Sequence, residues 1–300
     1  MRKEILYQFL TPITHTSSPK FLKSPVVTTQ CTPGRIIILN RVDLSELEAE
    51  ASLDFLLNDL DEALIGAFLV LMRAKGETYE EVVGLATAML KHALKVEGLV
   101  DAVDIVGTGG DGANAVNIST EAWIVAAACG AKVEKVSFLQ QGSRSSSSAC
   151  GSVDVEEMGV VIDLEPEVGV TRCVNEVGIG FMMAPIYHPA MKAVRPVRKK
   201  LKVKNVFNVL GPMLNPARVP YAVVGVYAED LVLNMAKALQ RFGMKRALSL
   251  EDVTGANFRM FMDFLKSLSI FGEKAPPYQP YLNPIATCSA AACYIVIFSN

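Results

Sequence analysis

Residues 103–120 read VDIVGTGGDGANAVNIST, and this stretch decides the fold of the chain. Its apolar start at 103–106 is typical of a buried strand, and the small-residue run AWIVAAACGA at 122–131 suits a buried helix. The glycine-rich loop between them favours phosphate binding, because backbone N–H groups and a helix N-terminus attract anions. The alternative is a tight strand-to-helix turn that needs glycine at positive φ. The spacing matches neither the Rossmann nor the Walker A pattern.

The composition restricts the class of protein. Three hundred residues allow one large domain or two unequal ones. A net charge of −2 gives no reason to expect a nucleic-acid or membrane-surface partner, and no apolar run reaches the length of a membrane span. The six cysteines include no CxxC pair and none lies at metal-ligand spacing from a histidine, so we expect a reducing compartment and no disulfide framework.

The first 35 residues differ from the rest of the chain. They hold five cations, one acid (Glu4) and many Ser, Thr and Pro residues. A basic, hydroxyl-rich and acid-poor leader is typical of an organelle transit peptide, here one for the plastid. An ordinary disordered tail on a cytoplasmic protein is the alternative, and in both cases we expect the leader to lie outside the fold.

Residues 36–100 have the pattern of a small helical domain. Ser45 with Glu48 and Thr78 with Glu81 each form a predicted capping box at the start of a helix. Apolar residues recur at helical spacing after each box, and Gly76 is placed to end the helix before the second box. We therefore expect three short amphipathic helices.

Residues 101–250 alternate between strand and helix patterns, which predicts a larger α/β domain with a mostly parallel sheet. A segment near 165–200 is expected to pack with the helical domain, and Pro166 to open a helix. Residues 251–300 form a divergent tail whose apolar end, CSAAACYIVIFSN, would leave a bare sheet edge if the sheet stopped there. Beyond 103–106, the expected strands are 131–135, 160–162, 221–227 and 245–250, with a helix at 229–242.

Two further segments carry groups that suit anionic ligands. The hydroxyls and guanidinium of QQGSRSSSSACGS at 140–152 match phosphate oxygens, although a flexible serine-rich linker has the same composition. In FMMAPIYHPAMKAVRPVRKKL at 181–201, cations alternate with prolines and apolar residues. That mixture leaves a ligand-facing role open beside the simpler interpretation of a solvated basic face.

Four motifs in order, GTGGDGANAVNIST, GSRSSSSACGS, HPAMKAVRPVR and FNVLGPMLNP, make residues 36–248 resemble the anthranilate phosphoribosyltransferase family of tryptophan biosynthesis. The resemblance implies a helical domain beside an α/β domain of the nucleoside phosphorylase and phosphoribosyltransferase type, dimerised through the helices. It also implies transfer of the phosphoribosyl group of phosphoribosyl pyrophosphate to anthranilate, with Mg²⁺ present, giving N-(5-phosphoribosyl)anthranilate and pyrophosphate. Two alternatives are an inactive truncated isoform that still dimerises and a pyrimidine nucleoside phosphorylase, which HPAMKAVRPVR fits less well.

The resemblance also implies which residues form the site. No nucleophile or general base is assigned, because the reaction mainly requires an oriented amine and a held pyrophosphate. Anthranilate would be contacted by Gly107, Ser143, His188 and Arg198, and Mg²⁺ by Ser119. Phosphoribosyl pyrophosphate would be contacted by Gly107, Gly110, Asp111, Asn117, Ile118, Ser119, Thr120, Lys135, Gly142, Arg144, Ser145, Ser146, Ser147, Ser148 and Ser152.

The sequence departs from the family pattern at four places. Five residues, 136–140, separate Lys135 from the Gln-Gly-Ser-Arg run, and their sequence VSFLQ is typical of a translated intron end. Ala115 stands where the family has Thr or Ser, and Ser143 where it has Asn. The Asp-Glu pair that holds magnesium in the family is missing after Leu250. We therefore expect an altered second phosphate loop and an incomplete metal site, as in an aberrantly spliced or C-terminally truncated form.

Overall fold

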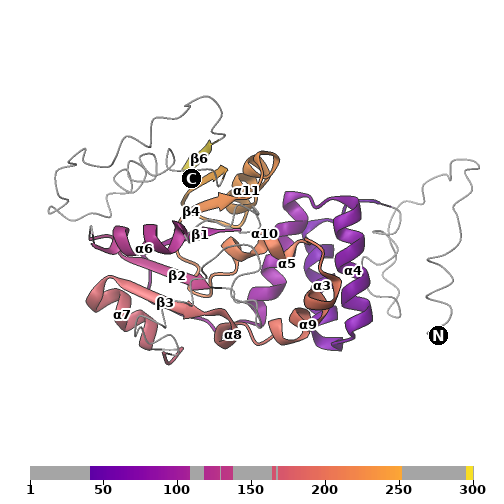
Figure 1. Cartoon of the computed structure of the whole chain (residues 1–300), viewed down its shortest axis with the longest axis horizontal. Coiled ribbons are helices and arrows are strands. Elements are labelled where there is room, and N and C mark those ends of the chain that lie inside the picture. The colour runs from indigo at the N-terminus through magenta and orange to yellow at the C-terminus, as the bar shows by residue number, and fades with distance from the viewer. Residues whose placement is uncertain are drawn as a thin grey trace, which may run out of the picture. The chain divides into compact units, whose positions relative to one another are not determined.

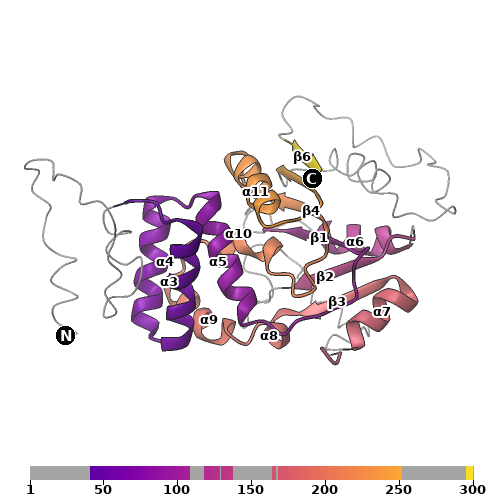
Figure 2. The same cartoon turned by 180° about the vertical axis from the view of Figure 1, so that it is seen from behind.

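A computed structural model describes residues 41–108, 118–128, 130–137, 164–166, 168–251 and 295–299 (Figures 1 and 2). The leader at 1–35 and the strand expected at 160–162 lie outside these residues. Of the divergent tail after 251, the description covers only 295–299.

In the described part of the N-terminal region, three helices form a bundle: α3 (Glu46–Asp59), α4 (Glu62–Lys75) and α5 (Tyr79–Lys91). Both predicted capping boxes are confirmed, and Gly76 is the C-cap of α4 as expected. α3 and α5 cross closely at Gly84, where a Cβ atom would lie 2.1 Å from the carbonyl oxygen of Glu46. A glycine is therefore required at this crossing, because the backbones leave no room for a side chain.

A buried ion pair joins the end of α4 to the start of α5. Lys75 Nζ lies 2.8 Å from Glu81 Oε2, and both side chains are almost fully buried. The other Glu81 oxygen accepts the backbone N–H of Leu44 at 2.7 Å, and Oε2 accepts that of Thr78. Glu81 is therefore more than the helix cap that the local sequence predicts, because it also fixes the chain segment that enters α3.

Within the described residues the sheet has six strands in the order β3-β2-β1-β4-β5-β6, most of which are labelled in Figure 1. Neighbouring strands from β3 to β5 are parallel, and β6 pairs antiparallel with β5. The prediction of a mostly parallel sheet is therefore confirmed, and the apolar C-terminal run covers the edge of β5. The strands are β1 (Val103–Gly107), β2 (Val133–Ser137), β3 (Ile179–Met183), β4 (Tyr221–Val226), β5 (Arg246–Glu251) and β6 (Ile295–Ser299).

Three expectations about elements need correction. β2 begins at Val133, two residues later than predicted, and runs to Ser137 inside the VSFLQ segment. β3 at Ile179–Met183 was not predicted, because its apolar run merges with the Pro-rich segment after it. Pro166 does not open a helix, since α7 begins three residues later at Gly169. The remaining helices are α6 (Ile118–Ala128), α7 (Gly169–Val177), α8 (Ala184–Tyr187), α9 (Met191–Leu201), α10 (Phe207–Leu210), the 3-10 turn η2 (Gly211–Met213) and α11 (Glu229–Arg241).

The bundle shares one hydrophobic core with part of the α/β domain. Buried residues of α3, α4 and α5 belong to the same cluster as those of α9, α10, β4 and α11. α9 lies directly on α4, where Val197 approaches Gly66 and Lys200 Nζ pairs with Glu62 at 2.5 Å. No helix among the described residues is long and apolar enough to cross a membrane.

Candidate active site

The described strands place a topological switch point between β1 and β4. After β1, the next two strands of the chain, β2 and β3, lie on one side of β1. The following two, β4 and β5, lie on its other side. In open α/β sheets, ligands bind outside the carboxyl ends of the strands at such a point. Here those ends are Gly107 of β1 and Val226 of β4.

The glycine-rich loop starts at this switch point. The backbone N–H of Thr108, the residue after β1, donates to the Gly225 carbonyl at 2.8 Å. The Thr108 hydroxyl accepts the N–H of Tyr227, the residue after β4, at 3.1 Å. These two bonds hold the first residues of the loop against the end of β4.

The other end of the loop leads into α6. Ser119 and Thr120 lie in the first turn of this helix, Ser119 half-buried and Thr120 buried. Trp123, one turn further, is buried and lies 6.0 Å from the ring of Phe181 on β3, which anchors α6 to the sheet. Three predicted site residues within the loop, Gly110, Asp111 and Asn117, lie outside the described residues, and of Ile118 only the backbone is described.

Most of the second phosphate loop lies outside the described residues, and of Lys135 only the backbone in β2 is described. Within VSFLQ, Val136 and Ser137 extend β2 and pair with Met182 and Met183 of β3. The first two residues of this segment therefore lengthen a strand. The predicted residues outside the description are Gly142, Ser143, Arg144, Ser145, Ser146, Ser147, Ser148 and Ser152.

His188 follows α8 and is buried, with 1% of its surface exposed. Its Nε2 lies 2.7 Å from the Leu214 carbonyl oxygen, and since a carbonyl can only accept, Nε2 carries the proton. Burial lowers the pKa of His188 to about 4, although the bond to the carbonyl acts in the opposite direction. The imidazole is therefore neutral at physiological pH, with a fixed tautomer.

Arg198 provides a largely buried positive charge on α9. Its guanidinium carbon lies 5.6 Å from the centre of the Phe207 ring, and among the described residues no carboxylate forms a salt bridge with it. Burial, and to a smaller extent the nearby positive charge of Arg195, lower the pKa of Arg198 to about 10. The side chain remains charged at neutral pH, so it suits an anionic ligand group.

A buried cluster of polar side chains lies between β1, β2 and the loop before β4. The sequence alone did not predict it. Asn215 Nδ2 donates to Asp104 Oδ2 at 3.0 Å and to Glu134 Oε2 at 2.6 Å, while Asn215 Oδ1 accepts the Ala217 N–H. The two acids are partners in the β1–β2 register. Asn215 thus ties two central strands to the loop that carries the Leu214 carbonyl. The sequence did contain a signal for this cluster, because Asp104 and Glu134 are acidic residues within the apolar strands β1 and β2.

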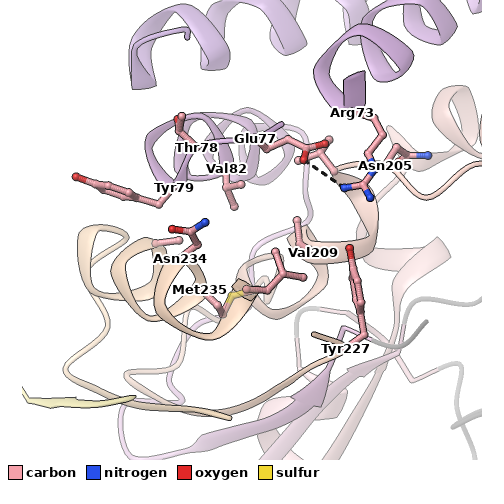
Figure 3. A pocket seen from close by; sticks show the side chains of 13 residues that line it. Arg73, Glu77, Thr78, Tyr79, Val82, Asn205, Val209, Tyr227, Asn234 and Met235 are labelled. Atoms are coloured by element: carbon pink, nitrogen blue, oxygen red, sulfur yellow. Dashed lines mark ion pairs between the residues drawn. The ribbon is translucent and has the colours of Figure 1, made fainter. Parts of the chain in front are cut away.

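A small cavity of about 40 Å³ lies between the bundle and the α/β domain (Figure 3). Tyr227 extends from the end of β4 toward Arg73 and Asn205, and Arg73 pairs with Glu77 at 4.0 Å (Figure 3). Burial raises the pKa of Glu77. The cavity is too small for a substrate, but its Tyr227 wall adjoins the switch point.

Comparison with known families agrees with this architecture. Residues 37–93 match the helical bundle domain of a glycosyl transferase family, and residues 99–258 match the α/β domain of the same family. The chain belongs to this glycosyl transferase family. The two-part fold expected from the sequence is thereby confirmed for this family member, while the exact domain boundaries stay a prediction.

Curated relatives in the glycosyl transferase family carry the name anthranilate phosphoribosyltransferase. The protein of Chlamydia caviae is 47% identical over 206 residues, covering 68% of this chain and 58% of the relative. That of Herpetosiphon aurantiacus is 46% identical over 215 residues, covering 71% and 62%. The chain therefore spans about three fifths of the length of these relatives.

Solved structures that resemble this chain carry the same name as the curated relatives. Anthranilate phosphoribosyltransferase from Thermus thermophilus is 36% identical with a TM-score of 0.67, covering 74% of this chain and 67% of that chain. The enzyme from Saccharomyces cerevisiae in complex with PRPP and Mg is 29% identical with a TM-score of 0.59, covering 69% and 61%.

Proposed function

We propose that the chain transfers the phosphoribosyl group of phosphoribosyl pyrophosphate to anthranilate and releases pyrophosphate. The observation that carries this proposal is the glycine-rich loop leaving the sheet at its β1–β4 switch point. The names of the relatives and of the solved structures support the choice of substrates.

The reaction replaces one bond at the anomeric carbon of the ribose. The anthranilate nitrogen forms a bond to this carbon, the bond to pyrophosphate oxygen breaks, and the amine loses a proton. Charge develops on the leaving pyrophosphate, so donors aimed at its oxygens lower the barrier. In this proposal, the backbone N–H groups of the glycine-rich loop and the first turn of α6 supply those donors.

The second substrate is proposed to bind on the side of α9. The Arg198 guanidinium would bind the anthranilate carboxylate, since a planar fork of N–H donors matches the two carboxylate oxygens. His188, a neutral ring with 1% of its surface exposed, would stand behind the same side of the site. Holding both substrates in a fixed orientation accounts for a large part of such rate accelerations.

Magnesium is proposed to enter with the pyrophosphate group. Among the described residues, no three His, Cys, Asp or Glu side chains gather into a metal cluster. Mg²⁺ is commonly bound by one or two protein carboxylates together with substrate phosphates and water, and the Asp-Glu pair of the family is missing from the sequence after Leu250. The Ser119 hydroxyl is the proposed protein ligand. When bound, the ion would neutralise charge on the departing pyrophosphate.

Measuring phosphoribosylanthranilate formation by the 300-residue protein with Mg²⁺ tests the proposal directly. Turnover of anthranilate supports it, and a folded protein without turnover supports the inactive-isoform alternative instead. Phosphate-dependent cleavage of uridine would support the nucleoside phosphorylase alternative. A pyrimidine base has no carboxylate that needs the Arg198 charge, which favours the first proposal.

A second copy of the chain is the proposed partner of the bundle. Leu47, Ala51 and Phe55 follow one another at i, i+4 and i+8 on α3, and all three are exposed. Leu47 is 75% exposed and Phe55 41%. An apolar stripe of this kind on a helix favours burial against another surface, which supports a homodimer.

The leader is proposed to direct the protein to plastids. The support is its composition, basic, hydroxyl-rich and nearly free of acids over residues 1–35. Fusing these residues to a fluorescent protein in plant cells tests the idea, with the same fusion carrying Glu at the five cation positions as the control. Diffuse cytoplasmic fluorescence of the unmodified fusion would contradict it.

A further inference from the structure

Asn215 is a buried polar residue to which the family motifs assign no role. It lies in the loop between η2 and β4, with 2% of its surface exposed. Its Oδ1 accepts the N–H of Ala217 at 2.9 Å, and its Nδ2 donates to Asp104 and Glu134 at 3.0 and 2.6 Å. A backbone N–H can only donate, so Oδ1 is the acceptor and Nδ2 must face the two carboxyl groups. The side chain therefore has one possible orientation.

The backbone of Asn215 is fixed as well. Its carbonyl oxygen accepts the N–H of Arg218 at 3.0 Å. Pro216 follows it, and a proline disfavours the helical region for the residue before it. The peptide plane between Leu214 and Asn215 is thereby held in place. That plane contains the Leu214 carbonyl, whose oxygen lies 2.7 Å from Nε2 of His188.

His188 connects this peptide to α9. The carbonyl oxygen of His188 accepts the N–H of Met191, the first residue of α9, at 3.0 Å. Arg198 lies about two turns further along the same helix. A continuous series of hydrogen bonds and peptide units thus runs from β1 and β2 through Asn215 to the helix that carries the proposed carboxylate-binding arginine.

We propose that Asn215 is a positioning residue for the anthranilate side of the site. It holds the Leu214 carbonyl against His188, and so fixes the imidazole and the start of α9. The inference rests on the proposed function for the identity of the substrate. An amide suits the position because it supplies two N–H donors and an acceptor without a charge, whereas an ionised carboxylate of the same shape supplies no donor.

The variant Asn215→Asp tests the role. It keeps the acceptor for Ala217 but removes both donors and brings a third carboxyl group beside two others, where like charges repel. We expect the loop to move and the Nε2–H proton resonance of His188 to shift or disappear in ¹⁵N–¹H NMR spectra. The chain has three histidines, and His188→Gln identifies the resonance by its absence.

The same variant should also change the kinetics selectively. We expect kcat/KM for anthranilate to fall about 10- to 100-fold, the cost of displacing a bound group by ~1 Å. The KM for phosphoribosyl pyrophosphate should change little. A purely structural role would lower the free energy of unfolding without separating the two substrates.

Asn205→Asp is the matched control, because Asn205 is also buried and its side chain bonds locally, to Val203 and Phe207. It should leave the His188 resonance and the anthranilate kinetics unchanged. If Asn215→Asp does not fold, Asn215→Ser takes its place with the same measurements. A serine hydroxyl can still accept a nearby backbone N–H, but it is too short to bond both carboxyl groups.

The outcomes are decisive in both directions. A changed His188 resonance and a selective anthranilate defect, both confined to the Asn215 variant, support the inference. An unchanged resonance in the folded variant, the same effects in Asn205→Asp, or equal losses for both substrates overturn it. Absence of turnover by the unmodified protein contradicts the proposed function, while the His188 resonance still decides whether Asn215 positions the imidazole.

Discussion

Arg198 keeps its charge although its side chain is largely removed from water and, in the described part of the chain, is paired with no acid. Burying a cation without a partner is costly, so such a residue favours a ligand that supplies the missing negative charge. We expect Arg198→Met to raise the KM for anthranilate 10- to 100-fold, equivalent to about 1.5–3 kcal/mol for a hydrogen bond to a charged group. The KM for phosphoribosyl pyrophosphate should change little.

Steady-state kinetics with each substrate varied in turn provides the measurement for Arg198. Lys192→Met is the control, since Lys192 is an exposed cation on the same helix. An unchanged anthranilate KM in Arg198→Met would show that the carboxylate binds elsewhere.

His188 gives a prediction about pH. Its pKa falls from 6.5 to about 4 on folding because burial disfavours the charged ring. The unfolded chain therefore binds the extra proton first as pH falls, so the contribution of His188 to stability is complete above about pH 6.5. As pH falls from 6.5 to 4, this contribution is lost, and the free energy of unfolding decreases by about 3 kcal/mol in total.

Urea unfolding between pH 4.5 and 7 measures this dependence. His188→Gln keeps a hydrogen-bond donor without the titration, so its free energy of unfolding should fall less steeply over the same range. Parallel pH profiles for the two proteins would contradict the assignment.

At the scale of single elements, α3 carries the prediction about assembly. We expect the double variant Leu47→Asp, Phe55→Asp to sediment as a monomer where the unmodified protein sediments as a dimer, because charges on both sides of the contact repel and desolvate poorly. Leu94→Asp is the matched control, since Leu94 is 45% exposed and lies outside α3. A monomeric unmodified protein would remove the basis for the dimer.

The elements also show what local sequence predicts. The caps of α3 and α5 were predictable, because Ser45 and Thr78 bond to residues three positions away. The β4 and β5 strands were also expected, since β4 is an apolar run and β5 follows the predicted helix at 229–242 with apolar residues at 247, 248 and 250. β3 was missed because its apolar residues continue through Ala184 into the proline-containing α8, so the apolar pattern does not mark where the strand ends.

Contacts between distant residues account for what the sequence did not predict in the site. Glu134 and Asn215 are 81 positions apart, and only the β1–β2 register brings Glu134 beside Asp104. The approach of Lys204 to Tyr227 likewise depends on the path of the chain after α9. By contrast, the family motifs could point to His188 and Arg198 as site residues, because both lie in the short motif HPAMKAVRPVR.

For the whole molecule, the core shared by the bundle and the α/β domain predicts a single unfolding transition. Residues of α4, α9, β4 and α11 pack in one cluster, so neither part can lose its structure without exposing apolar surface of the other. We expect the calorimetric and van't Hoff enthalpies of unfolding to agree. Two resolved heat-absorption peaks would show instead that the two parts unfold independently.

Trp123 gives the molecule an internal optical probe. It is the one tryptophan of the chain, and it lies buried in α6 within two turns of the residues that end the glycine-rich loop. Because the indole is buried, its fluorescence emission is expected at short wavelength. Anion binding at the N-terminus of α6 changes the electric field along this helix, and the indole of Trp123 lies within that field. Emission from one ring thus reports occupancy of the loop without any label.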